Sequence, residues 1–146
     1  MFQGFFYARI SNDGILVRNK HVIAFNRKAG AIMKLLTKEI RKKLPPLYSQ
    51  EDKGGQAIVY AKFFTPSAQW TWYVLEGESV LDAAGREIDY RFFGLVDGHE
   101  RELGYFMLSE LEGVRGPFGL PIERDLYWQP KKLAEIVPEM FIPADK

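Results

Sequence analysis

The stretch YRFFGLVDGHERELGYFML, residues 90–108, decides the fold of this chain of 146 residues. Its two ends, residues 90–96 and 102–108, are rich in the aromatic and aliphatic side chains that favour β-strands. The polar DGHE between them is typical of a turn, so the pattern predicts a β-hairpin. This register pairs Gly94 with Gly104, and two facing glycines inside a hairpin indicate a bend or a close approach of the backbones.

A helix and two more strands are expected before the hairpin. Residues 37–43 predict a helix, because Thr37 is a suitable N-cap, basic residues gather towards the C-terminal end, and PP at 45–46 stops it. Residues 56–64 and 69–76 predict strands separated by the turn TPSA. The polar residues 77–88 are expected to form a loop.

Shorter elements are expected after the hairpin. SELE at 109–112 fits a capping box and predicts a short helix, and RGPFGLP at 115–121 predicts an irregular loop. Residues 122–128 predict a last strand and residues 131–136 a short helix. Together the elements predict an α+β fold: a single compact domain with an antiparallel β-meander sheet, a few short helices and a loop rich in proline and glycine.

Charge divides the chain into unequal parts. Residues 1–46 hold ten lysines and arginines against two acids, whereas residues 47–129 hold seven against fourteen. An acidic body repels phosphate, so nucleic acid is the less favoured partner and a protein with a basic face is the expected one. The chain has no cysteine, which excludes disulfides, thiol nucleophiles and cysteine-ligated metals. No apolar run is long enough to span a membrane and no signal peptide is evident, so we expect a cytoplasmic protein without membrane contact.

Several residues are candidates for contact with a protein partner. The tryptophans of the WTWY segment and the aromatic residue of the Pro/Gly-rich loop resemble the anchors that such interfaces use. Two arginines next to this loop are expected to fix it through carboxylate or carbonyl contacts, since a guanidinium group binds both in fixed geometry. The interaction candidates are Trp70, Trp72, Arg115, Phe118, Arg124 and Asp125.

Two other kinds of site have weaker support. A basic patch formed by Lys34, Lys38, Arg41, Lys42 and Lys43 could contact phosphate, but a solvated amphipathic helix explains it equally well. The carboxylates Asp89, Glu110, Glu112, Glu123 and Asp125 could converge on a divalent metal, and His99 could act with the acids around it. Structural ion pairs and a solvated turn are the favoured interpretations of these acids. No motif for nucleotide binding, hydrolysis or zinc is present, so we expect no catalytic residue, metal or cofactor.

The chain from residue 33 onward resembles the bacterial family known as domain of unknown function 2958. The segments that carry the resemblance are MKLLTK (33–38), LPPLY (44–48), KFFTP (62–66), WTWY (70–73), FFGLV (92–96), ELGYF (102–106) and the run 109–127. The resemblance implies a small family encoded largely on plasmids, integrative elements and related mobile DNA, with no catalytic residues to carry over. Residues 1–32 lie outside the pattern, and we expect them to be an extension of short strands preceding a domain at 33–146.

Three classes of function remain after these considerations. The first is a non-catalytic accessory protein of a mobile genetic element that binds a host or element-encoded protein, for example to inhibit a host defence or DNA-processing complex. The second is a nucleic-acid-binding accessory protein, and the third is a metal-dependent enzyme with a carboxylate site. The acidic, aromatic-rich and motif-free composition favours the first class.

Overall fold

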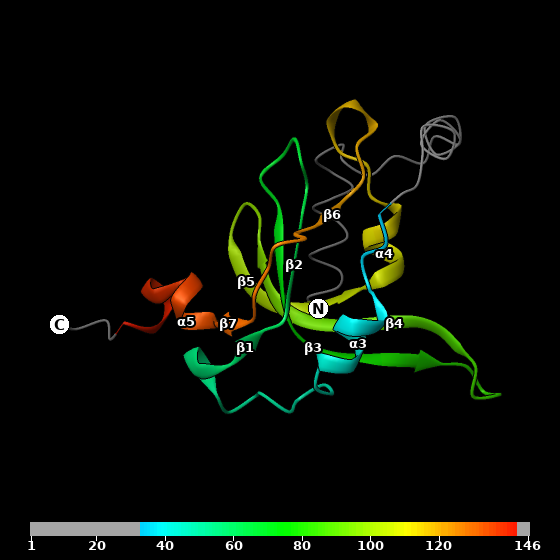
Figure 1. Cartoon of the computed structure of the whole chain (residues 1–146), viewed down its shortest axis with the longest axis horizontal. Coiled ribbons are helices and arrows are strands. Elements are labelled where there is room, and N and C mark those ends of the chain that lie inside the picture. The colour runs from blue at the N-terminus through cyan, green and yellow to red at the C-terminus, as the bar shows by residue number, and fades with distance from the viewer. Residues whose placement is uncertain (1–32, 143–146) are drawn as a thin grey trace.

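A five-stranded antiparallel sheet organises the computed structural model, which describes residues 33–142 (Figure 1). The strand order is β5-β4-β3-β2-β6. The strands are β2 (Ala61–Phe64), β3 (Thr71–Leu81), β4 (Glu87–Asp97), β5 (Arg101–Met107) and β6 (Glu123–Arg124). Short helices flank this sheet, so the predicted α+β fold is confirmed. The strands expected within residues 1–32 lie outside the described residues.

The hairpin of β4 and β5 has the predicted register. Gly94 lies opposite Gly104, and Phe92 and Phe93 lie opposite Phe106 and Tyr105. A Cβ atom on Gly94 would lie 1.9 Å from the carbonyl oxygen of Tyr73 in β3. The glycine is therefore required by the close approach of β3 on its other side.

The first helix, α3 (Lys38–Lys43), also forms as predicted. The Thr37 side chain accepts a hydrogen bond of 3.1 Å from the amide of Ile40, which caps the helix. Basic residues fill its last turn, and the chain becomes extended at Leu44, just before the two prolines.

The prediction of a loop at residues 77–88 is wrong, because β3 and β4 extend into this segment and form a two-stranded arm (Figure 1). The two strands join at residues 82–86, where Asp82 Oδ1 accepts hydrogen bonds from the amides of Ala84 (2.8 Å) and Arg86 (2.9 Å). Gly85 has φ +84°, which suits this tight connection. The same hydrogen bonds and the ion pair with Arg86 lower the pKa of the Asp82 carboxyl, the backbone bond to Arg86 contributing most. Polar residues such as Glu78 and Ser79 hide the strand period here, because the arm extends beyond the core.

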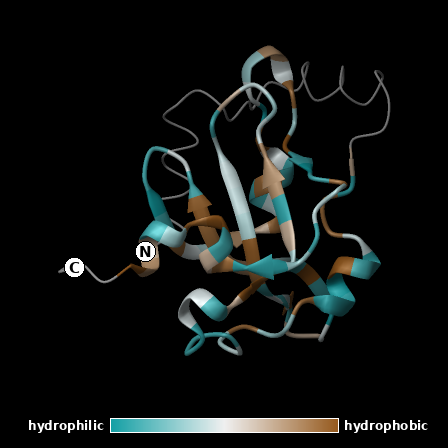
Figure 2. Cartoon of the chain, turned by 60° about the vertical axis from the view of Figure 1, so that its left-hand side comes forward, coloured by the Kyte–Doolittle hydropathy of each residue, from teal (hydrophilic) through white to brown (hydrophobic). Residues whose placement is uncertain are grey.

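The sheet has two buried faces, and a β-bulge interrupts β3 between them. Val74 pairs with Gly94 but Glu76 pairs with Phe93, so Leu75 is an extra residue. The first face holds an aromatic core whose fully buried members include Trp72, Phe63, Phe92 and Phe106. On the second face, Leu75 and Leu95 pack with a smaller cluster that contains Ala57, Val59, Leu133 and Val137. Figure 2 shows the hydrophobic residues along the central strands.

The second face is covered by a small separate layer. The single strand expected at 56–64 is divided into β1 (Ile58–Val59) and β2, and β1 pairs with β7 (Lys131–Lys132) instead of joining the main sheet. The helix expected at 131–136 is shortened to α5 (Leu133–Ile136), because the two lysines before it belong to β7. The 3₁₀ helices η1 (Gly54–Gln56) and η3 (Pro138–Phe141) complete this layer.

The last part of the sheet is irregular. Helix α4 (Leu108–Gly113) forms two residues earlier than the capping box predicted, because its N-cap is Met107 and not Ser109, and Glu110 accepts a 2.9 Å hydrogen bond from the Met107 amide. The strand expected at 122–128 is reduced to β6, because Asp125 Oδ1 accepts from the amide of Tyr127 (2.9 Å) and turns the chain away. No helix within residues 33–142 is long and apolar enough to cross a membrane.

Candidate functional site

The loop between α4 and β6 presents an aromatic side chain to solvent. The loop is closed by a bridge between Arg115 and Pro121 and by a 2.7 Å hydrogen bond from the Gly116 amide to the Leu120 carbonyl. At its tip is the 3₁₀ turn η2 (Pro117–Gly119), in which Phe118 has φ 64° and ψ 16°. The Phe118 side chain is 91% exposed. A bulky residue in the left-handed region is a conformational outlier, so a defined backbone holds this ring out in water.

Arg115 fixes the base of this loop from inside the protein. The residue is 3% exposed, and its Nη1 donates to the carbonyl oxygens of Glu112 (2.9 Å) and Val114 (2.7 Å). Burial lowers the pKa of its guanidinium group. Arg115 makes carbonyl contacts of the predicted kind, but its guanidinium group binds residues 112 and 114 at the end of α4, before the loop 116–121 that it was expected to fix.

Arg124 has a different role from the one expected. Its Nη1 donates to the carbonyl oxygen of Lys34, and its backbone amide meets the Met33 sulfur at 3.1 Å. The prediction that Arg124 fixes residues 116–121 is wrong, because its guanidinium group binds the segment that precedes α3. Arg124 therefore attaches this segment to the edge of the sheet.

A hollow of about 450 Å³ lies along the β2–β6 edge. Among the residues that line it are Met33, Lys62, Phe64, Trp70, Glu123, Arg124, Asp125, Leu126 and Tyr127. Leu126 and Tyr127 are 59% and 88% exposed, and the turn set by Asp125 presents them. Asp125 also forms an ion pair with Lys62 at 3.9 Å. The hollow thus brings together Trp70, Arg124 and Asp125 among the expected residues.

The two tryptophans belong mainly to the core. Trp70 and Trp72 stack with ring centroids 6.0 Å apart and are 4% and 0% exposed. Only Trp70 reaches the hollow, and the edge of its ring also meets His99 at the hairpin tip (5.6 Å between centroids). A partner bound to this surface would therefore contact Leu126 and Tyr127 before either tryptophan. Leu126 and Tyr127 were not among the expected residues, because the alternating pattern of residues 122–128 predicted a strand.

Three exposed apolar residues, Phe118, Leu126 and Tyr127, form what we call the apolar edge surface. They lie on the two loops at the two ends of β6. Glu112 and Glu123 lie beside these loops, and within residues 33–142 neither of them forms an ion pair. Arg115 and Arg124 bind backbone carbonyls, so their positive charges remain beside these two glutamates. The border of the apolar edge surface therefore carries charges of both signs.

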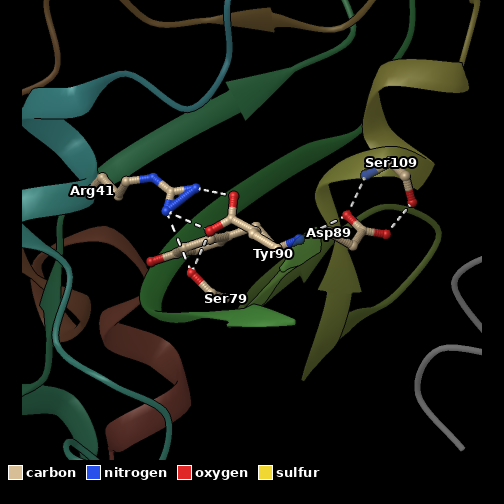
Figure 3. Close-up of polar contacts among 6 residues, drawn as sticks. Arg41, Ser79, Asp89, Tyr90 and Ser109 are labelled. Carbon is tan, nitrogen blue, oxygen red and sulfur yellow. Dashed lines mark hydrogen bonds and ion pairs between the residues drawn. The ribbon is translucent and has the colours of Figure 1, made fainter. Parts of the chain in front are cut away.

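Arg41 is engaged within the fold, unlike the rest of the basic patch. Its guanidinium group pairs with both carboxylate oxygens of Glu87 (Nη1 to Oε1, 2.9 Å), donates to Ser79 Oγ (3.4 Å) and lies 4.8 Å from the centre of the Tyr90 ring (Figure 3). These contacts join α3 to the β3–β4 arm. The exposed cations of the patch are Lys34, Lys38, Lys42 and Lys43.

Three of the acidic candidates for a metal site, Asp89, Glu110 and Asp125, serve local structure. Asp89 accepts hydrogen bonds from the amides of Tyr90 (2.8 Å) and Ser109 (3.1 Å) and from the Ser109 hydroxyl, so it holds the start of α4 (Figure 3). Burial, and to a smaller extent the charge of Asp89, raises the pKa of Glu112, and burial is also the main cause that raises the pKa of Glu110. In the described part of the chain, no group of three or more histidines and acids is placed to hold a metal ion.

The chain belongs to the family described as Protein of unknown function (DUF2958), whose model matches residues 35–137. The match begins at Leu35, just before α3, and ends at Val137, just after α5. It therefore covers the main sheet, the small layer except η3, and the apolar edge surface. No curated protein matches the chain. No solved structure matches it either.

Proposed function

We propose that this DUF2958 protein is a non-catalytic accessory protein of a bacterial mobile genetic element, which acts in the cytoplasm by binding a host or element-encoded protein through the apolar edge surface. The mobile-element setting comes from the family resemblance. The binding role is supported above all by one observation, the exposed Phe118 ring on a left-handed backbone. Inhibition of a host defence or DNA-processing complex is the form of this role that the setting favours.

The backbone at Phe118 gives the first argument. A left-handed residue other than glycine costs about 1–2 kcal/mol, and burial of the ring does not offset this cost because the ring is 91% exposed. A phenylalanine at this position therefore lowers the stability of the monomer, and no contact within the monomer compensates for this loss. Contact with a partner supplies the missing burial, as aromatic anchors do at interfaces.

The composition of the body gives the second argument, which concerns the partner's charge. Residues 47–129 hold fourteen acids against seven lysines and arginines, and complementary charge favours association with a basic protein face. The same charges disfavour phosphate, so the nucleic-acid alternative depends on the four exposed lysines near α3. Four phosphate contacts would give weak binding with a salt slope of about −3 to −4.

Affinity purification tests the proposal. The full chain is immobilised and exposed to bacterial lysate with and without nuclease, beside a Phe118→Ala/Tyr127→Ala variant. Ile88→Ala is the matched control, because Ile88 is 64% exposed on the β3–β4 arm, away from this surface. We expect a protein that survives nuclease, is retained by the control and is lost by the double variant.

Two results would count against the proposal. A partner that disappears after nuclease treatment would favour the nucleic-acid alternative, and replacement of the four exposed lysines by alanine would then abolish capture. A protein partner retained in full by the double variant would show that another surface binds it.

A further inference from the structure

A second hollow, of about 250 Å³, opens on the face of the sheet opposite the aromatic core. Four aromatic rings contribute to its lining, those of Tyr48, Phe93, Tyr105 and Phe141. Two carboxylates, Glu51 and Glu76, line it as well, and among residues 33–142 no lysine, arginine or histidine does. These residues come from the turn after α3, three strands and η3, which explains why no sequence motif indicated them.

Glu76 is the buried charge of this hollow. It is 2% exposed, and it faces this side of the sheet because the bulge at Leu75 pairs it with Phe93. Its two carboxylate oxygens accept hydrogen bonds from the amides of Tyr48 and Gln50, each 2.7 Å long. No cationic side chain of residues 33–142 pairs with it. Each oxygen keeps a further lone pair, so the carboxylate can accept from a donor that enters the hollow.

The aromatic residues form walls around this charge. The Phe93 and Tyr105 ring centroids are 5.0 Å apart, and the Tyr48 ring lies 6.3 Å from that of Tyr105 at an angle of 60°. Tyr48 has φ 73° and its side chain is 63% exposed, so a left-handed backbone again holds an aromatic ring at a rim. Within residues 33–142 it shares this conformation with Phe118 alone among residues other than glycine. The negative faces of such rings attract cations.

The electrostatic environment of the hollow is negative, which also favours a cation. Burial raises the pKa of Tyr105 to about 12, and hydrogen bonding with Tyr48 and the negative charges of Glu76 and Glu51 add to this effect. The Tyr105 phenol is therefore neutral at physiological pH, and the charge in the hollow comes from the two glutamates. A buried carboxylate without a counter-cation favours the entry of a cation.

We propose that this hollow binds one cationic side chain, that of a lysine or arginine, from a protein partner. The volume suits a single side chain, since pockets for drug-sized ligands are commonly about 300–1,000 Å³. Glu76 and Glu51 supply the charge, and the rings of Tyr48, Phe93 and Tyr105 pack against the aliphatic stem. The site shares no residue with the apolar edge surface, so it goes beyond the function proposed above and can fail independently of it.

Titration of the ¹⁵N-labelled full chain with short capped peptides tests the proposal. The peptides have the form Gly-Gly-X-Gly-Gly, where X is lysine, arginine, or one of the uncharged analogues norleucine and citrulline. We expect saturable amide shifts at Tyr48, Gln50, Glu76, Phe93 and Tyr105 with a lysine or arginine peptide and none with the analogues. A single side chain gives an affinity of about 1 mM.

Variants separate binding from folding. Glu51→Gln and Tyr48→Ala should each weaken the binding of the lysine or arginine peptide by about 3–10-fold. Glu39→Gln, which changes an exposed glutamate on α3, should leave this affinity unchanged. Glu76→Gln should weaken the binding more than either of the first two variants. If that variant fails to fold, Glu51→Gln and Tyr48→Ala decide the question, because neither side chain is buried in the core. Shifts that do not saturate, equal shifts with norleucine or citrulline, or no effect of either of these two variants would overturn the proposal.

Discussion

Replacement of Phe118 by glycine and by alanine tests whether this residue serves binding and not stability. A buried phenylalanine costs about 3–5 kcal/mol when it is truncated to alanine. The Phe118 ring is 91% exposed, so Phe118→Ala should change the free energy of unfolding by less than about 0.5 kcal/mol. Phe118→Gly removes the left-handed penalty of about 1–2 kcal/mol but adds about 0.5–1 kcal/mol of unfolded-state entropy. The glycine variant should therefore be more stable than the alanine variant by about 0–1.5 kcal/mol.

Urea unfolding followed by tryptophan fluorescence measures these differences, because the chain has three tryptophans and two of them stack in the core. Phe106→Ala is the reference for a buried ring, since Phe106 is 0% exposed, and it should lose about 3–5 kcal/mol. The reasoning is refuted if Phe118→Ala loses more than about 1.5 kcal/mol, or if the glycine variant is clearly the less stable of the two. The first result would mean that the ring packs on the protein in solution.

Three further perturbations follow from the geometry. Gly94→Ala should destabilise the protein by at least about 1–3 kcal/mol in the same unfolding assay, because its Cβ would lie 1.9 Å from the Tyr73 carbonyl; an unchanged transition would show that β3 and β4 can separate freely. Arg41→Ala should lower the free energy of unfolding by about 0.5–1.5 kcal/mol, since it removes a half-exposed ion pair with Glu87 and a cation–π contact with Tyr90. A double-mutant cycle with Glu87→Gln should assign part of this loss to the ion pair. A coupling energy of zero between the two residues would contradict this assignment. The pKa of Tyr105 is about 12 in the folded protein and lies above the unfolded value near 10, so the contribution of this group to stability is fully present below about pH 10 and is lost as pH rises towards 12. Tyr105→Phe should lack this loss in melts between about pH 10 and pH 12, and identical pH profiles would show that the phenol titrates normally.

The parts of the fold that the sequence predicts best are those in which local signals agree. The β4–β5 hairpin has strand-forming residues, a polar turn and facing glycines, and each of these signals requires the same register. The helix at Lys38–Lys43 has its cap, its charge distribution and its stop in consecutive residues. The predictions that fail concern elements whose form depends on a distant neighbour. Residues 131–132 become a strand only because β1 lies beside them.

The candidate site shows the same limit. The irregular loop around Phe118 and the binding of carbonyl oxygens by Arg115 could be predicted, since a loop rich in proline and glycine beside an arginine has few other arrangements, but the carbonyls that Arg115 binds precede the loop. The partner of Arg124 could not, because Lys34 is 90 residues away along the chain. Trp72 was expected at the surface as an anchor, but the sheet buries it between Val96 and Phe63, its partners on β4 and β2. The aromatic hollow around Glu76 could not be predicted from the sequence either, because its residues lie on five segments that are far apart along the chain.

The bulge at Leu75 also determines where β3 can tolerate a change of length. Side chains alternate along a strand, so an insertion or deletion at most positions moves every later residue to the other face. Leu75 is the extra residue between two paired positions, Val74 with Gly94 and Glu76 with Phe93. Its deletion would straighten the strand and leave both neighbours on their present faces. A chain shortened by this one residue would keep Glu76 beside Phe93, and it would lose one leucine from the second core and the local twist of the sheet.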